Sequence, residues 1–193
     1  MLISPSMLVL ASQSPRRREI LTNAGFTFEV RPANIAEIPL EDEDPAAYVL
    51  RLAHEKAAAI PCAPGDLILA ADTTVAASGH ILEKPHSDED AARMLRLLSG
   101  RTHQVHTGVC LRSQDGQWSG VESTTVRFLE MSEPELLAYA RSGEPMDKAG
   151  GYAIQGLASK FIDRIEGCYF NVVGLPISLV YRLMKQAGFL PAA

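Results

Sequence analysis

The sequence has few cysteines and no long apolar run, and each absence excludes a class of protein. Cys62, Cys110 and Cys168 are far apart and form no CxxC pair. This argues against a zinc site or a disulfide framework and favours free thiols in a reducing compartment. No stretch approaches the ~20 apolar residues that a transmembrane helix needs. Because residues 1–5 also lack the basic segment of a signal peptide, we expect a cytoplasmic protein with no membrane partner.

The chain also lacks a surplus of positive charge. Its 18 Lys and Arg residues stand against 23 Asp and Glu, which gives a formal net charge of -5. Broad nucleic-acid binding depends on many cations that release counterions from phosphates, so we expect no nucleic-acid partner. What the sequence does have is 47% hydrophobic residues over a length of 193. That is enough for one ordered core, and we expect a single domain over residues 1–193.

Apolar runs alternate with helix signals along the chain and predict an α/β fold. The expected strands are 7–11, 26–30, 67–71, 81–82, 105–111, 121–129 and 161–165, and the expected helices are 15–24, 45–60, 87–98, 132–141 and 176–187. The run at 67–71 is continuously apolar, as expected for a central strand covered on both faces. It leads directly into Asp72, and a strand end of this kind is where α/β sheets bind ligands.

Three arginines, Arg16 to Arg18, follow Ser14 and Pro15 in the first turn of the first expected helix. The helix dipole places partial positive charge at this end, so the cations are unfavourable unless an anion compensates them. A polyphosphate would do so by accepting backbone N–H groups, serine hydroxyls and bidentate arginine contacts. The alternative is that these side chains point to solvent.

Three other polar residues suit a nucleotide, and each has a simpler alternative. Asp72 would bind a divalent metal or orient a water, or would start a turn by bonding its own backbone. Lys84 would reach a phosphate near Asp72, or is an ordinary surface lysine. Gln155 lies in a glycine-rich loop, 147–156, where its amide would donate to O4 of uracil or thymine and accept from N3–H. Otherwise it ties down the loop backbone.

A segment from Ser99 to His103 superficially invites comparison with a phosphate-binding P-loop. The pattern GxxxxGK[ST] is absent, and Gly100 follows a helix, whereas the P-loop glycines precede one. We interpret Gly100 as a helix C-cap, and His103 and His106 as structural residues.

Several short motifs occur in order and in register over essentially the whole chain. They are Leu10 to Arg17, Ala71-Asp72-Thr73, Glu83-Lys84-Pro85, Ser99-Gly100 with His103 and Thr107-Gly108, Asp147 to Gly150, and Ile154-Gln155-Gly156, with Gly174-Leu175-Pro176 before the last helix. In this combination the chain resembles the Maf family of nucleotide pyrophosphatases. The resemblance implies an α/β fold with a mixed, twisted sheet flanked by helices, two lobes around a cleft, and an architecture related to inosine triphosphate pyrophosphatases.

The resemblance also implies an activity. The chain would hydrolyse dTTP and UTP, and modified pyrimidine nucleotides with them, to the monophosphate and pyrophosphate, as house-cleaning of nucleotide pools. A divalent metal cation, Mg²⁺ or Mn²⁺, would be the cofactor. Asp72 would be the proton acceptor or a metal ligand, and Glu37 a second ligand. Relatives often have another acid where this chain has Ala36, so the metal would keep more water.

The remaining site residues are carried over from the same family pattern. Arg16, Thr73 and Gln155 mark the subgroup that acts on dTTP and UTP, and Ser12, Arg17, Lys56 and Lys84 match other substrate-binding positions. The family suggests a homodimer. Two alternatives stay open: a nucleotide-binding regulator of septum formation and cell division without essential turnover, and the Maf subgroup that acts on methylated guanosine triphosphate. Gln155 and Thr73 argue against the second.

Overall fold

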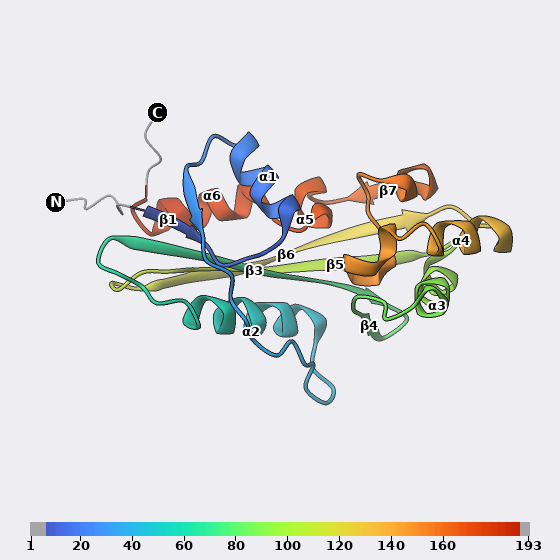
Figure 1. Cartoon of the computed structure of the whole chain (residues 1–193), viewed down its shortest axis with the longest axis horizontal. Helices are drawn as coiled ribbons and strands as arrows, with labels where there is room; N and C mark the ends of the chain where they lie inside the picture. The colour runs from blue at the N-terminus through green and yellow to red at the C-terminus, as the bar shows by residue number, and fades with distance from the viewer. Residues whose placement is uncertain (1–6, 190–193) are drawn as a thin grey trace. The chain divides into compact units, whose positions relative to one another are not determined.

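The structure, a computed structural model, describes residues 7–189, and these form a mixed sheet flanked by helices (Figure 1). The strands are β1 Met7–Leu10, β2 Phe28–Val30, β3 Asp66–Ala77, β4 His80–Leu82, β5 Thr102–Arg112, β6 Gln117–Phe128 and β7 Ile162–Glu166. Their order is β2-β1-β3-β5-β6-β7, with β4 paired to β3. β1 runs parallel to β2 and β3, whereas the pairs β3–β4 and β6–β7 are antiparallel. The α/β expectation with a mixed sheet is therefore confirmed.

The helices are α1 Pro15–Asn23, α2 Pro45–Ala58, α3 Asp88–Leu98, α4 Glu133–Ala140, α5 Tyr169–Val173 and α6 Ile177–Gln186, with short 3-10 helices η1 Glu144–Asp147, η2 Ala149–Gly151 and η3 Leu157–Phe161. All five expected helices are present. The short helix α5 was not expected, and the glycine-rich loop contains 3-10 turns. No helix within residues 7–189 is both long enough and apolar enough to cross a membrane.

The chain divides into two compact units. The first joins the described part of Met1–Asp72 to Thr107–Glu122 and to the described part of Gly174–Ala193, and the second joins Thr73–His106 to Ser123–Val173. The long strands β3, β5 and β6 contribute residues to both units. The single domain over residues 1–193 stays a prediction, and the signal-peptide argument at residues 1–5 lies outside the described residues.

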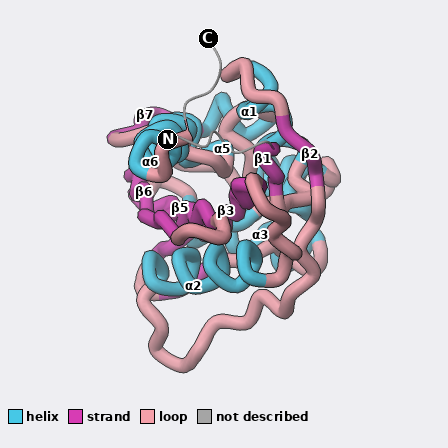
Figure 2. Tube along the Cα trace, turned by 90° about the vertical axis from the view of Figure 1, so that its left-hand side faces the viewer, coloured by secondary structure: helices cyan, strands magenta, loops and turns pink. Residues whose placement is uncertain are grey.

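In the first unit, α2 lies on one face of the sheet and α1 and α6 lie on the other (Figure 2). Local signals start these helices where the sequence predicts. Ser14 caps α1 by accepting the Arg17 N–H at 3.4 Å, and Pro15 occupies the first turn. Asp44 caps α2 by accepting two backbone N–H groups. The inner face of α2 includes Lys56 among its buried residues, which brings one charged group into the unit.

One expectation about β3 is wrong. The strand does not end near Ala71 but continues to Ala77, so that Asp72 lies within it. The β-branched residues Thr73 to Val75 favour extended backbone. β4 then returns through the turn at Ser78 and Gly79, both with positive φ, and pairs with residues 75–77. Asp72 is therefore held by strand geometry on both sides.

The second unit is organised around a buried aromatic cluster that contains His103. The ring of His103 lies edge-on to Phe128 and Tyr152, and its Nε2 is 2.8 Å from the Tyr152 hydroxyl. Helices α3 and α4 pack against each other beside this core. Gly100, with φ +67, ends α3 as expected. The structural interpretation of His103 is confirmed.

The buried His103 makes the stability of the protein depend on pH. Burial lowers its pKa from 6.5 to about 4. Between these pH values the unfolded chain binds a proton that the folded chain does not. The free energy of unfolding therefore falls as the pH drops through this window, by about 3 kcal/mol for this residue. We expect His103→Gln to remove this part of the decline in urea unfolding measured at about pH 7 and about pH 4.5. An equal decline in both proteins would contradict the assignment.

Candidate functional site

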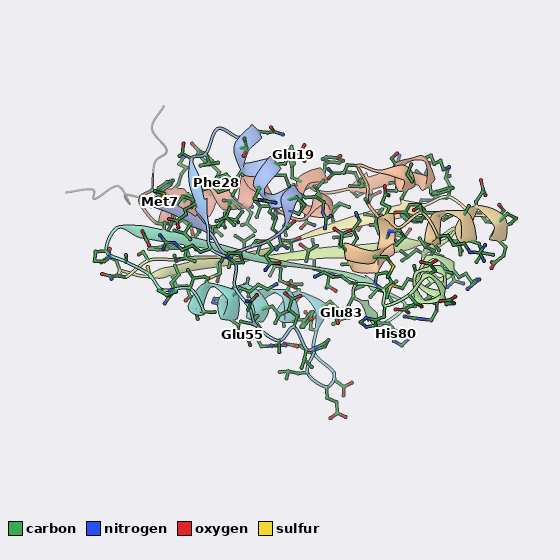
Figure 3. All side chains as sticks on the ribbon, in the orientation of Figure 1. Met7, Glu19, Phe28, Glu55, His80 and Glu83 are labelled. Carbon is green, nitrogen blue, oxygen red and sulfur yellow. The ribbon has the colours of Figure 1, made fainter. Side chains whose placement is uncertain are left out.

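Lys56, in the last turn of α2, is at the centre of a partly buried charge cluster in the first unit. Its neighbour Glu55, labelled in Figure 3, is exposed and pairs with Arg51 at 2.9 Å. One residue further along the helix, Lys56 turns inward and is only 6% exposed. Its Nζ lies 2.5 Å from Asp72 Oδ1 and 2.6 Å from Glu37 Oε1. The structure thus brings together three residues that the sequence proposes separately.

The segment that carries Glu37 is irregular, and Arg51 ties it to α2. The Arg51 guanidinium forms two 2.7 Å hydrogen bonds to the Glu43 carboxylate and a third, of 3.0 Å, to the Ile38 carbonyl. The hydrogen bonds from Arg51 lower the pKa of Glu43 to about 2, so the pair stays charged over the neutral range. This contact holds the chain on the C-terminal side of Glu37 against the helix that carries Lys56.

The arginines at the start of α1 differ: Arg16 and Arg17 are half-buried, and Arg18 is exposed. Protein oxygens compensate Arg17. Its Nε donates to the Gly174 carbonyl at 2.8 Å, and its Nη1 donates to the Ala71 carbonyl at 2.8 Å and to Ser12 Oγ at 3.2 Å. Burial lowers the pKa of Arg17, while the nearby charges of Asp72 and Glu37 act to raise it. Arg17 therefore links α1 to the backbone beside Asp72.

This linking role predicts a stability effect. Arg17→Lys keeps the charge but loses the planar fork that serves three acceptors in different directions. With hydrogen bonds worth about 1 kcal/mol each, we expect the free energy of unfolding to fall by about 2 kcal/mol in urea titration. The exposed Arg18, substituted by lysine in the same way, is the matched control and should change little. Equal effects at the two positions would contradict this role.

The cluster offers two carboxylates to a cation. The Glu37 and Asp72 oxygens both lie within 2.6 Å of one nitrogen, so they are close enough to share a ligand. Mg²⁺ is typically held by one or two carboxylates together with substrate phosphates and water. Within residues 7–189 no group of three or more His, Cys, Asp or Glu side chains is arranged to hold a metal. The donor set fits a metal that arrives with phosphate oxygens.

Of the other predicted residues, Arg16 belongs to the first unit, and Thr73, Lys84 and Gln155 belong to the second. Thr73 is half-buried, and Lys84 and Gln155 are exposed. Lys84 follows Glu83, which Figure 3 labels just after β4, and the Glu83 carbonyl accepts the Gly150 N–H at 3.1 Å. Gly150 has φ +70, and a Cβ there would lie 2.7 Å from Val75. The glycine-rich loop is therefore seated against β3 and β4 beside Lys84.

The sequence did not predict two sets of side-chain contacts in these units. It did not identify Arg17 as a link, because its partner Gly174 lies 157 residues away. It also missed Glu144 and Tyr139, which hydrogen-bond to the loop that carries Gln155. No local pattern signals such contacts, since the partners are too far apart in the chain for helix or turn spacing to connect them.

Comparison with known proteins gives one family and close relatives of similar length. The family model described as "Maf-like protein" matches residues 7–187. The chain is 51% identical over 184 residues to a dTTP/UTP pyrophosphatase of Koribacter versatilis (strain Ellin345), with 95% of each chain covered. It is 48% identical over 183 residues to a dTTP/UTP pyrophosphatase of Thermococcus onnurineus (strain NA1), with 95% of this chain and 98% of the relative covered.

One solved structure can be aligned with nearly the whole chain. It is titled as a nucleoside-triphosphatase / dITP/XTP pyrophosphatase from Mycobacterium abscessus, and the match covers 96% of this chain and 100% of that one. Sequence identity is 14% and the TM-score is 0.43. A likeness of this size carries no argument about architecture or activity.

Proposed function

Because this chain belongs to the Maf-like protein family, we propose that it hydrolyses dTTP and UTP to the monophosphate and pyrophosphate. The relatives quoted above carry that activity in their names and match nearly the whole chain. This favours turnover over a regulator that only binds nucleotide, and a pyrimidine substrate over methylated guanosine triphosphate. Removal of unwanted pyrimidine nucleotides, modified ones included, is the role that follows.

The observation that carries the proposal is the ion-pair cluster in which the buried Lys56 bridges the buried Asp72 and the more exposed Glu37. Burial of Lys56 and Asp72 strengthens their electrostatic interactions with a triphosphate. When phosphate and a cation bind, Lys56 can exchange its ion pair with a carboxylate for one with a phosphate oxygen. The cluster therefore combines an acceptor for a water proton with a cation for the phosphate.

In the reaction, a water oxygen bonds to the α-phosphorus, and the bond from the α-phosphorus to the bridging oxygen of the β-phosphate breaks. Pyrophosphate leaves with that bridging oxygen and its electron pair. Asp72 orients the water and accepts its proton, while Lys56 and Arg16 neutralise the phosphates. Ser12 Oγ, which already accepts the N–H of Ser14 at 3.2 Å, presents its hydroxyl beside the α1 N-terminus. Arg17 also contributes to phosphate binding, in addition to holding this backbone.

The residues that would hold a divalent cation, Mg²⁺ or Mn²⁺, are Glu37 and Asp72. A cation bound there supplies Lewis-acid polarisation of the α-phosphoryl group. If Asp72 is a metal ligand, it is a weak base, and its main contribution is then to place the water. Both versions of its role require the same carboxylate.

Thr73, Lys84 and Gln155 complete the proposed substrate set. Asp72 ends the first unit and Thr73 begins the second, so the two groups of residues adjoin along the chain. Lys84 supplies a cation for the triphosphate, and the amide of Gln155 pairs with O4 and N3–H of uracil or thymine. Arg16, Thr73 and Gln155 together select these bases.

We further propose a homodimer that acts in the cytoplasm, without nucleic-acid or membrane partners. No disulfide links Cys62, Cys110 or Cys168, all of which lie within the described residues. Burial raises the pKa of the Cys110 thiol to about 12, which keeps it unreactive. Free thiols are consistent with a reducing compartment.

The proposal is tested by a screen of canonical and modified nucleoside triphosphates for pyrophosphate release, with Mg²⁺ and with Mn²⁺. We expect dTTP and UTP to be the preferred canonical substrates, and chelation of the metal to stop the release. Tight nucleotide binding without any pyrophosphate release would instead support a regulator. Preference for methylated guanosine triphosphate would overturn the assignment of Gln155.

A further inference from the structure

The loop that carries Gln155 is held at both ends by two side chains from outside it. Gln155 lies within a turn in which the Gly156 N–H donates to the Ala153 carbonyl at 3.1 Å. Before the turn, the Ala153 N–H donates to the Tyr139 hydroxyl at 3.2 Å. After it, the Leu157 N–H donates to Glu144 Oε2 at 3.0 Å. All of these contacts lie within the second unit.

The two anchors are themselves joined. The Tyr139 hydroxyl donates to Glu144 Oε1 at 2.8 Å, so this hydroxyl both donates and accepts, and each carboxylate oxygen of Glu144 accepts one hydrogen bond from this set. Tyr139 is 5% exposed and Glu144 is half-buried. Burial, followed by the bond to Glu144, raises the pKa of Tyr139, which keeps its hydroxyl protonated.

Gly156 allows the carboxylate to approach this closely. A Cβ on Gly156 would lie 2.5 Å from Glu144 Cδ and 2.6 Å from Oε1, so the carboxylate would have to move away from the turn. The glycine has φ -111 and therefore an ordinary backbone conformation, so the need for glycine here is one of space. The turn, its glycine and the carboxylate form one packed arrangement.

We propose that Glu144 and Tyr139 are positioning residues that fix the turn of Gln155 and thereby set the preference for uracil and thymine. The proposal rests on the proposed function, in which Gln155 pairs with the base. Two hydrogen bonds to a flat ring require the amide to stand at one distance and angle. A turn released at either end loses both bonds, whereas contacts to the triphosphate stay as they are.

Glu144→Gln and Tyr139→Phe test this with little change in shape. In the first, one carboxylate oxygen becomes an NH₂ that faces a donor, and in the second, Ala153 N–H loses its acceptor. For each variant we expect KM for dTTP and UTP to rise about tenfold while kcat changes by less than about twofold. The preference over CTP in kcat/KM should fall by about the same tenfold factor. Combining both changes should add little, because they break one network.

Gly156→Ala provides an independent variant, since its Cβ displaces the carboxylate without removing it, and we expect the same rise in KM. The matched control is Glu135→Gln. That carboxylate caps the N-terminus of α4 by accepting hydrogen bonds from the Ser132 N–H and hydroxyl. It should lower thermal stability and leave KM and the preference over CTP unchanged.

The outcomes separate this inference from the proposed function. A lower kcat for every nucleotide with unchanged KM would mean that the two residues only stabilise the fold, and would overturn the inference. The inference would also be overturned if the wild type is active and the preference for dTTP over CTP in all three single variants stays within about twofold of the wild-type value. Loss of two hydrogen bonds to the base should change that preference by more. A wild type that releases no pyrophosphate from any nucleotide would overturn the proposed function itself.

Discussion

Replacing Asp72 with asparagine is expected to reduce pyrophosphate release from dTTP by about 10²- to 10⁴-fold, the range that a positioned acid or base contributes. The amide keeps the shape of the side chain and an oxygen that accepts from Lys56 Nζ, whose distance from Oδ1 is 2.5 Å in the wild type. It cannot take a proton and is a poor ligand for a divalent cation. The measurement is initial-rate pyrophosphate release, with dTTP binding followed by calorimetry. We expect binding to change only a few-fold.

Asp66→Asn is the matched control for this variant. Asp66 begins the same strand, β3, is 5% exposed against 6% for Asp72, and pairs with Arg31 at 2.8 Å. Its loss removes one partly buried ion pair and leaves the Lys56 cluster intact, so activity should stay within a few-fold of wild type. If the two variants lost activity equally, the cause would be the fold, and Asp72 would lose its assigned role. Activity of Asp72→Asn within a few-fold of wild type would have the same consequence.

Replacing Gly108 with alanine is expected to give the largest loss of stability. Gly108 lies in β5 where the strand meets α2, and a Cβ there would lie 2.5 Å from the Val49 carbonyl carbon and 2.7 Å from the Leu50 nitrogen. These are backbone atoms of a helix, so no side-chain rotation relieves the overlap. Overpacking usually costs about 1–3 kcal/mol, and we expect at least the upper end here. Urea unfolding of purified protein, or failure to obtain folded protein, would show it.

Gly120→Ala is the control, because it adds the same methyl group to β6 of the first unit. Its Cβ would meet only the Leu179 side chain, with the nearest atom at 3.2 Å, so a shift of a few tenths of an ångström by that side chain relieves the contact. We expect a change in the free energy of unfolding below about 1 kcal/mol. Similar effects at Gly108 and Gly120 would contradict the close approach of β5 to α2.

These two glycines illustrate the limit of what the sequence by itself determined. Local rules located the elements: Ser14 with Pro15 starts α1, Ser78 with Gly79 turns β3 into β4, and Gly100 ends α3. Each rule acts over a few residues, where backbone sterics and capping hydrogen bonds decide the conformation. Neither Gly108 nor Gly120 carries a local signal that distinguishes a tight contact from open packing.

Strand length was less well determined. The apolar run predicted β3 only to Ala71, because hydrophobicity stops at Asp72. The strand continues to Ala77 because β4 folds back on residues 75–77 and satisfies their backbone groups. A hydrophobic pattern records which residues are buried, whereas the end of a strand depends on whether a partner strand is present.

For the candidate site, too, the sequence and the tertiary structure determined different things. Residue types and motif order identified Glu37, Lys56 and Asp72 as candidates from the sequence, through a family resemblance that the comparisons confirm. Only the tertiary structure decided that Lys56 lies between the two carboxylates. It also decided that Arg17 donates hydrogen bonds to backbone carbonyl groups of the protein. The physical reason is range: capping and periodicity act over one or two turns, whereas these contacts join residues 16 to 157 positions apart, and only packing brings them together.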